Sequence, residues 1–124
     1  MSDKDIEQEI QDKGLTAPRV TPGHIAEIIV SEHYFTASDA SGSGESARTL
    51  YKSALEMDFS HKCLDLLTFC VLVLRNGFTV TGESACASPE NFDPEIGRKI
   101  ARENAVNKVW MLEGYLLKQA LSEQ

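Results

Sequence analysis

Two arginines, Arg98 and Arg102, stand four residues apart in a segment with helical periodicity. At that spacing both side chains lie on one face of a helix, where like charges repel by a few tenths of a kcal/mol. An anion bound between them would relieve the repulsion, and the planar guanidinium group binds phosphate through two parallel hydrogen bonds. Two interpretations remain open. The pair binds a phosphate-containing ligand, or both arginines are solvated or pair elsewhere, with Glu83 or Glu90.

The segment TGESACASPENFDPEIG, residues 81–97, joins a strand-like run to that helix and supplies further candidates. Phe92 is either a platform on which a nucleotide base stacks or half of a hydrophobic staple with the first turn of the helix. Asn91 can read a base edge or cap the turn, and Asn104 faces either a polar pocket or solvent. The predicted ligand-binding set is Asn91, Phe92, Arg98, Arg102, Asn104 and Thr81.

Residues that could support catalysis are scattered along the chain. The histidines are His24, His33 and His61. His61 and Cys63 are a lone pair of potential ligands, whereas a zinc site needs three or four. We therefore expect no catalytic residue, no metal and no cofactor, and we expect a binding protein that is not an enzyme. The cysteines show no metal-binding spacing and are typical of reduced thiols; they are Cys63, Cys70 and Cys86.

The composition is that of an ordinary soluble globular protein, with 124 residues of which 42% are apolar and 25% charged. No apolar run approaches the roughly 20 residues that span a bilayer. The acidic start MSDKDIEQEIQDKG differs from a signal peptide, so we expect a cytoplasmic protein without membrane contact. A formal net charge of -7 disfavours binding to a nucleic-acid polymer. It leaves a small anionic ligand open, because only the local charge matters there.

The first half of the chain predicts short helices and one strand. Residues 3–13 form a polar helix that ends at Gly14, and a second helix runs from Pro22 to about His33 with Thr21 as its N-cap. HYFTA then predicts a strand. The Ser- and Gly-rich run that follows predicts a flexible loop or insertion over residues 37–62.

The second half carries the strongest pattern, a β-hairpin. LLTFCVLVL (66–74) and FTVTGES (78–84) flank Asn76-Gly77, the dipeptide favoured in two-residue type I′ turns. Such a turn predicts the pairs Arg75 with Phe78, Val73 with Val80, and Val71 with Gly82. Phe69 would share their face, and the other face would carry Leu72, Leu74, Thr79, Thr81 and Glu83. Gly82 indicates a bulge or a close approach of another backbone.

A long helix is expected from Pro94 to about Leu121, with Asp93 as its N-cap. One stripe begins with the small residues Gly97, Ala101 and Ala105, which allow close packing. The helix carries more apolar surface than one small sheet can cover, so we expect a homo-oligomer, a dimer or higher. Gly114 is a potential kink.

These elements predict an α+β fold, in which an antiparallel, hairpin-centred sheet packs with a long C-terminal helix and short N-terminal helices. We expect residues 1–124 to form a single domain. Its parts are an N-terminal polar segment (1–20), a loop or insertion (37–62) and a core of hairpin plus long helix (66–124).

From about residue 66 to residue 118, the chain resembles a family of small phage and prophage proteins. The matching pieces are NGF-V-G-SA, PENFD-EIG-K-A--NA---W and LEGYLL. They are fold-bearing residues and not a catalytic signature. The family includes the type-one Thoeris anti-defence proteins.

The resemblance implies a specific function. Thoeris immunity makes a cyclic ADP-ribose isomer as an alarm signal, and the anti-Thoeris proteins are sponges that sequester it without degrading it. They assemble as homo-oligomers whose nucleotide pockets involve two protomers, and some also hold cyclic oligonucleotide signals at separate sites. By this resemblance we expect a phage anti-defence sponge in the host cytoplasm. The alternative is a small phage interaction protein that binds and inhibits a host protein.

Overall fold

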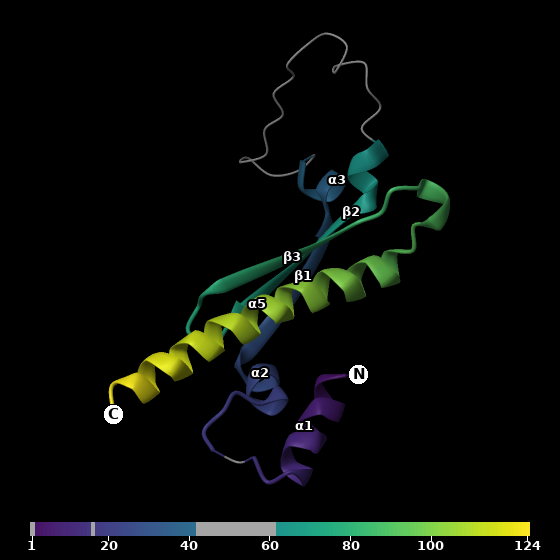
Figure 1. The fold of residues 1–124 in the computed structure, drawn as a ribbon. Helices are drawn as coiled ribbons and strands as arrows, with labels where there is room; N and C mark the ends of the chain where they lie inside the picture. Colours follow the sequence, from purple (N-terminus) through teal and green to yellow (C-terminus); the bar gives the residue numbers. More distant parts are fainter. Residues whose placement is uncertain (1, 16, 42–61) are drawn as a thin grey trace.

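The computed structural model of the chain describes residues 2–15, 17–41 and 62–124. Within them, a three-stranded antiparallel sheet lies against one long helix, which confirms the predicted α+β class (Figure 1). Most of the predicted loop, residues 42–61, lies outside the described residues. The helices are α1 (Asp3–Asp12), α2 (Pro22–Ile28), α3 (Ala37–Ser41) and α5 (Pro94–Ser122), with short 3-10 helices η1 (Lys62–Leu66) and η2 (Pro89–Asn91). The strands are β1 (Ile29–Thr36), β2 (Leu67–Leu74) and β3 (Thr79–Ala85).

The second helix is shorter than the sequence predicts. It ends at Ile28, and β1 begins at Ile29, so the expected helix to about His33 is wrong. The run IVSEHYFT is rich in β-branched and aromatic residues, which favour a strand when a partner strand is available. That partner is β2, which pairs with β1 in antiparallel register. Pairing over a long sequence separation therefore overrides the local helical spacing.

The hairpin exists as predicted, but its register differs by one residue. The carbonyl of Leu74 accepts a hydrogen bond from the Gly77 amide (2.8 Å), and the Leu74 amide donates to the Phe78 carbonyl (2.9 Å). The loop thus has three residues, with Gly77 at a φ of +88°, as in a type I turn followed by a bulge. Leu72 pairs with Val80 and Cys70 with Gly82.

The change in register moves side chains to the other face of the sheet, because strand residues alternate. Leu72 and Leu74 share the helix-facing side with Val80, and all three are buried. Phe69, Val71 and Val73 lie on the opposite face with the threonines of β3, where they are half-buried. The faces predicted from a two-residue turn are therefore wrong.

Close contact between α5 and the sheet depends on small residues, as the sequence predicts. Gly97, Ala101, Ala105 and Val109 are the buried residues of the helix. Gly82 of β3 lies against the helix backbone, so that a Cβ there would collide with the Ala101 carbonyl oxygen and come within 2.9 Å of the Ala105 Cα. The predicted close backbone approach at Gly82 is confirmed.

The C-terminal third of α5 continues beyond the sheet (Figure 1). Val109 is the last buried residue of the helix, and the helix runs unbroken through Gly114 to Ser122. Large apolar side chains on this third remain exposed, namely Met111, Leu112, Tyr115 and Leu116. No helix in the described part of the chain is long and apolar enough to cross a membrane.

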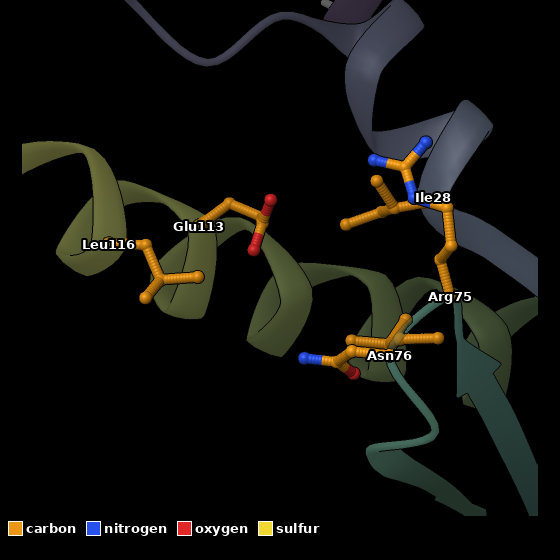
Figure 2. A pocket seen from close by; sticks show the side chains of 6 residues that line it. Ile28, Arg75, Asn76, Glu113 and Leu116 are labelled. Atoms are coloured by element: carbon orange, nitrogen blue, oxygen red, sulfur yellow. The ribbon is translucent and has the colours of Figure 1, made fainter.

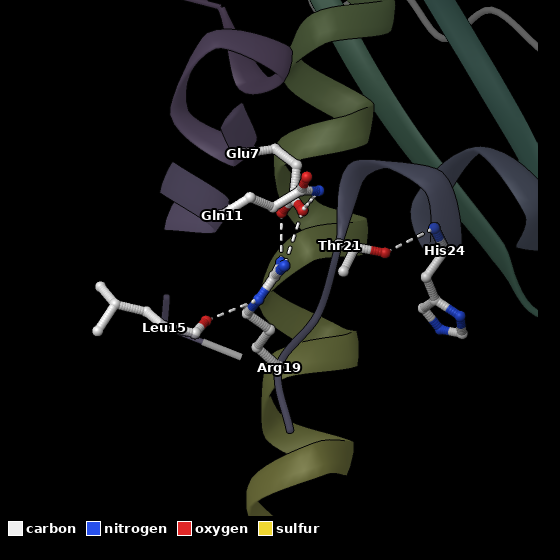
Figure 3. Close-up of polar contacts among 6 residues, drawn as sticks. All are labelled: Glu7, Gln11, Leu15, Arg19, Thr21 and His24. Atoms are coloured by element: carbon white, nitrogen blue, oxygen red, sulfur yellow. Dashed lines mark hydrogen bonds and ion pairs between the residues drawn. The ribbon is translucent and has the colours of Figure 1, made fainter. Parts of the chain in front are cut away.

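Helix α1 is attached to the rest of the chain by polar contacts. Figure 3 shows Arg19 reaching Glu7, where its Nη2 donates at 2.8 Å to Oε2, while its Nε donates to the Leu15 carbonyl. The Trp110 indole donates to Asp3 Oδ2 at 3.2 Å. Arg19 therefore holds the linker between α1 and α2 against α1, and the contact of Trp110 with Asp3 places α1 near α5.

Candidate functional site

The turn between β3 and α5 is rigidly built. The Cys86 amide donates to the Leu66 carbonyl (3.0 Å), and the Phe92 amide donates to the Pro89 carbonyl (3.2 Å). Asp93 Oδ1 accepts from the amides of Glu95 (2.9 Å) and Ile96 (3.2 Å), which confirms the predicted N-cap. These bonds fix the direction in which Phe92 leaves the backbone, back over the first turn of α5.

A hollow of about 180 Å³ lies between the first turns of α5 and the end of β1. Tyr34 and Thr36 point toward α5, since they pair with Cys70 and Thr68 on the helix-facing side of β2. The next residue of β1, Phe35, points to the opposite face of the sheet. There its ring stacks on that of Phe69 in the neighbouring strand β2, with centroids 5.6 Å apart. The hollow is lined by Tyr34, Phe35, Thr36, Asp39, Thr68, Phe92, Pro94 and Arg98.

Thr68 is the unusual member of this lining. Its side chain is 3% exposed, and its Oγ1 is the one buried side-chain polar atom of the described residues that has no hydrogen-bond partner. A Cβ on Gly97 would lie 3.0 Å from that oxygen and 3.6 Å from Phe92 Cε1. A buried hydroxyl without a partner costs about 1–3 kcal/mol, which makes Thr68 Oγ1 the atom of this lining with an unmet hydrogen bond.

The structure separates the two arginines. Arg98 lines the hollow, is exposed, and has no ion-pair or hydrogen-bond partner among the described residues. Arg102, one turn later, donates from Nε to Glu32 Oε1 on β1, and this bond raises the pKa of its guanidinium group. Of the two open interpretations, pairing elsewhere therefore describes Arg102, although its partner is Glu32 and neither of the two glutamates considered from sequence.

The other predicted ligand-binding residues lie away from the hollow's lining. Asn104 Nδ2 donates to the Glu83 carbonyl at 2.8 Å. Thr81 is on the opposite face of the sheet, and its carbonyl accepts from Lys108 Nζ at 2.6 Å. Asn91 is exposed in η2. The structure thus brings together Phe92 and Arg98 of the predicted set, and a ligand-binding role for the remaining residues stays a prediction.

Sequence reasoning missed Tyr34 and Thr68 as parts of this hollow. Burial raises the pKa of Tyr34 to about 12, and its hydroxyl donates to Glu32 Oε1 at 3.2 Å. Thr68 carries a signal that could have been noticed, because it is the polar residue in the apolar run LLTFCVLVL. Tyr34 carries none, since its place depends on how β1 pairs.

Two further hollows offer less to a polar ligand. Figure 2 shows the hollow at the hairpin end, about 160 Å³, where the Glu113 carboxylate lies among Ile28, Arg75, Asn76 and Leu116. That carboxylate is already bonded to His24 Nε2 at 2.6 Å. The third, about 240 Å³, lies between α1 and Trp110. Neither contains a residue of the predicted ligand-binding set.

The lining of the hollow offers several groups that can contact a ligand, among them the carboxylate of Asp39. Phe92 presents an apolar ring, Arg98 a cation, and Thr68 a hydroxyl, all within one hollow. Burial raises the pKa of the nearby Cys70 thiol, which disfavours its thiolate form. No group of three or more metal-binding side chains lies within the described ranges.

The fold and the hollow together define a small α+β protein whose candidate site combines an aromatic ring, an arginine and an unpartnered hydroxyl. The chain belongs to the Phage protein (N4 Gp49/phage Sf6 gene 66) family, whose model matches residues 20–121. The match begins before α2 and β1, so it extends well N-terminal of the stretch 66–118 in which the sequence resemblance lies, and it leaves α1 outside. Searches of curated proteins and of solved structures gave no match.

Proposed function

We propose that this phage-family protein binds and sequesters a cyclic ADP-ribose-type immune signal without degrading it. The observation that carries the proposal is the unpartnered hydroxyl of Thr68 beside Phe92 and Arg98 in one hollow. An adenine can stack on an aromatic ring, a phosphate can pair with an arginine, and a ribose hydroxyl can bond to a buried threonine. A cyclic oligonucleotide signal offers the same three groups and belongs to the same proposal.

Sequestration needs affinity and no chemistry. Among the described residues that line the hollow there is no histidine, and the raised pKa of Cys70 keeps that thiol neutral. The protein therefore acts as a sponge and not as an enzyme in this proposal, and its place of action is the host cytoplasm, where such signals are made.

The size of the hollow supports a site shared between protomers. Small-molecule pockets usually measure about 300–1,000 Å³, and a dinucleotide-sized ligand belongs in that range. The hollow measures about 180 Å³ and is open, so one protomer encloses part of the ligand. A second protomer supplies the remaining wall, and the exposed apolar residues of α5 provide surface for that association.

Binding and release of an intact ligand test the proposal. Purified protein is titrated with a cyclic ADP-ribose isomer in a calorimeter, and the complex is then heated and its small molecules are analysed by mass spectrometry. Stoichiometric binding and recovery of intact ligand support the sponge. Catalytic loss of the ligand would identify an enzyme. Binding of no cyclic nucleotide, together with specific capture of a host protein, would favour the inhibitor of a host protein.

A further inference from the structure

We propose that Glu32 determines the charge that the hollow accepts, because it holds Arg102 in an ion pair and leaves Arg98 as the cation that a doubly charged terminal phosphate could meet there. The inference rests on the proposed function, since it names a selectivity of the same site. Phosphodiesters and internal diphosphates carry one negative charge per phosphate group. A terminal phosphate monoester carries about 1.5 to 2 negative charges at neutral pH.

The placement of Glu32 is unusual for a residue beside an anion site. Its Oε1 accepts a hydrogen bond from Arg102 Nε. The same oxygen accepts a second one from the Tyr34 hydroxyl, at 3.2 Å. Tyr34 lines the hollow, so the carboxylate stands immediately behind that wall. The ion pair of Glu32 and Arg102 carries no net charge, so Arg102 adds little to the attraction that Arg98 exerts on an anion. The attraction withheld in this way is larger for a ligand with more charge.

The two arginines are spaced so that both could serve one ligand. They stand four residues apart on α5, and residues at that spacing are neighbours on a helix surface. Arg102 does not line the hollow while it is paired, but once freed from Glu32 its long side chain could turn toward Arg98, and the two cations together would suit the terminal phosphates of ADP or ATP. Glu32 takes one of these cations out of the site. Withholding a favourable contact from the wrong ligand contributes to specificity, because specificity is a difference between two affinities.

This selectivity would matter for a sponge, because linear adenine nucleotides share the adenine and the ribose of a cyclic signal. The linear nucleotides differ from the cyclic signal in that they end in a phosphate monoester, which carries more negative charge than an internal phosphate. A hollow lined by one arginine, Arg98, and one carboxylate, Asp39, attracts a doubly charged phosphate weakly, so it binds the cyclic ligand without filling with the linear ones.

A structural role offers the competing explanation, in which Glu32 only fastens β1 to α5. Two variants distinguish the possibilities. Glu32→Gln removes the charge that neutralises Arg102, whereas Arg102→Ala breaks the same ion pair by removing the cation and leaves the carboxylate in place. Both partners are substantially exposed, at 35% and 44% of their side-chain surface, so we expect both variants to fold.

The first experiment needs no nucleotide. Thermal unfolding of the wild type, Glu32→Gln and Arg102→Ala is measured in pyrophosphate and in sodium chloride of equal ionic strength. We expect pyrophosphate to raise the Tm of Glu32→Gln by several degrees more than it raises the Tm of the wild type. For Arg102→Ala we expect an increase in Tm no larger than that of the wild type. Equal shifts in all three proteins would overturn the inference, whether or not a cyclic signal binds.

The second experiment measures the selectivity itself. ADP competes for a bound, labelled cyclic ADP-ribose isomer, and the ratio of the two affinities is compared between proteins. In Glu32→Gln we expect the ratio to move toward ADP by about tenfold or more. A ratio that is unchanged, or that moves alike in both variants, would show a merely structural role. If the labelled ligand does not bind the wild type, the proposed function fails, and the pyrophosphate result still decides the role of Glu32.

Discussion

Gly97 lies directly over Thr68, so closely that a Cβ at position 97 would be 3.0 Å from the threonine Oγ1. The contact brings the first turns of α5 onto the central strand and leaves a buried hydroxyl facing them without a partner. An apolar side chain would serve packing better at this place. The arrangement therefore gives up stability for a polar group in the hollow, a compromise typical of binding sites.

Replacing Thr68 by valine should have opposite effects on stability and binding. Valine matches the shape of threonine but removes the unpartnered hydroxyl, so we expect the ligand-free protein to gain about 1 kcal/mol in the free energy of unfolding. Affinity for the cyclic ligand should fall at the same time. Urea unfolding and calorimetry measure the two quantities. Thr68→Ser, which keeps the hydroxyl, should retain affinity. A valine variant that is less stable and binds equally well would contradict a ligand-directed hydroxyl.

Arg98 should contribute more to binding than its neighbour of equal charge. Arg98→Ala removes charge-assisted hydrogen bonds to phosphate, worth about 1.5–3 kcal/mol, and should weaken binding by about 10- to 100-fold. Lys99→Ala is the matched control. It removes the same charge one residue away, from a side chain that is 73% exposed and pairs with Glu95. Equal affinities of the two variants, measured by calorimetry, would show that the hollow is not the anion site.

Gly82, where β3 meets α5, and Gly114, on the exposed part of α5, should respond oppositely to alanine. Gly82→Ala places a Cβ into the backbone of α5, which cannot move as a flexible side chain would, and we expect a loss of about 3 kcal/mol in the free energy of unfolding. Gly114→Ala meets nothing within 4 Å and gains helix propensity, so it should stabilise the protein by about 0.5–1 kcal/mol. Chemical denaturation tests both. Similar changes in the two variants would refute the close approach at Gly82.

Attachment of α1 should weaken in acid. The hydrogen bond from Arg19 holds the pKa of Glu7 below its ordinary value. A carboxyl group with a lowered folded-state pKa stabilises the fold above its unfolded pKa and loses that contribution as the pH falls through the folded value. We therefore expect α1 to detach below about pH 4.

The sole tryptophan reports on this detachment, because the Trp110 indole donates to Asp3 of α1. Its fluorescence emission should shift to the red in acid, while circular dichroism monitors the rest of the fold. Glu7→Gln should show the shifted emission already at neutral pH. An unchanged emission in that variant would mean that the ion pair does not hold the helix.

Self-association should depend on the C-terminal third of α5. Met111 and Tyr115, four residues apart, are 76% and 72% exposed, and large exposed apolar side chains of this kind mark association surfaces. The double change to lysine should lower the oligomeric state in sedimentation velocity and weaken ligand binding together. Gln119→Lys adds charge to the same part of the helix without removing an apolar group, and it should leave the assembly intact. A wild type that sediments as a monomer would refute this part of the proposal.

Elements with local signals could be predicted from the amino-acid sequence. Asp93 and Pro94 begin α5 because a carboxylate cap and a proline at the first helical position satisfy the helix terminus on the spot. The small residues of its buried stripe and Gly82 predict close packing, because a residue with a small side chain or none allows two backbones to approach wherever it stands. Phe92 and Arg98 stand close to that helix start in the sequence, so they could be predicted to lie near each other, and both line the same hollow.

Features that depend on residues far apart in the sequence became visible in the folded chain. The start of β1 at Ile29 and the one-residue change in hairpin register follow from strand pairing, which local periodicity does not encode. Glu32 meets Arg102 across 70 residues of sequence, and that meeting turns two apparently equivalent arginines into one that is paired and one that faces the hollow. Thr68 reads as an ordinary strand residue until α5 closes over it, because a hydroxyl lacks a partner only once the surrounding atoms are in place.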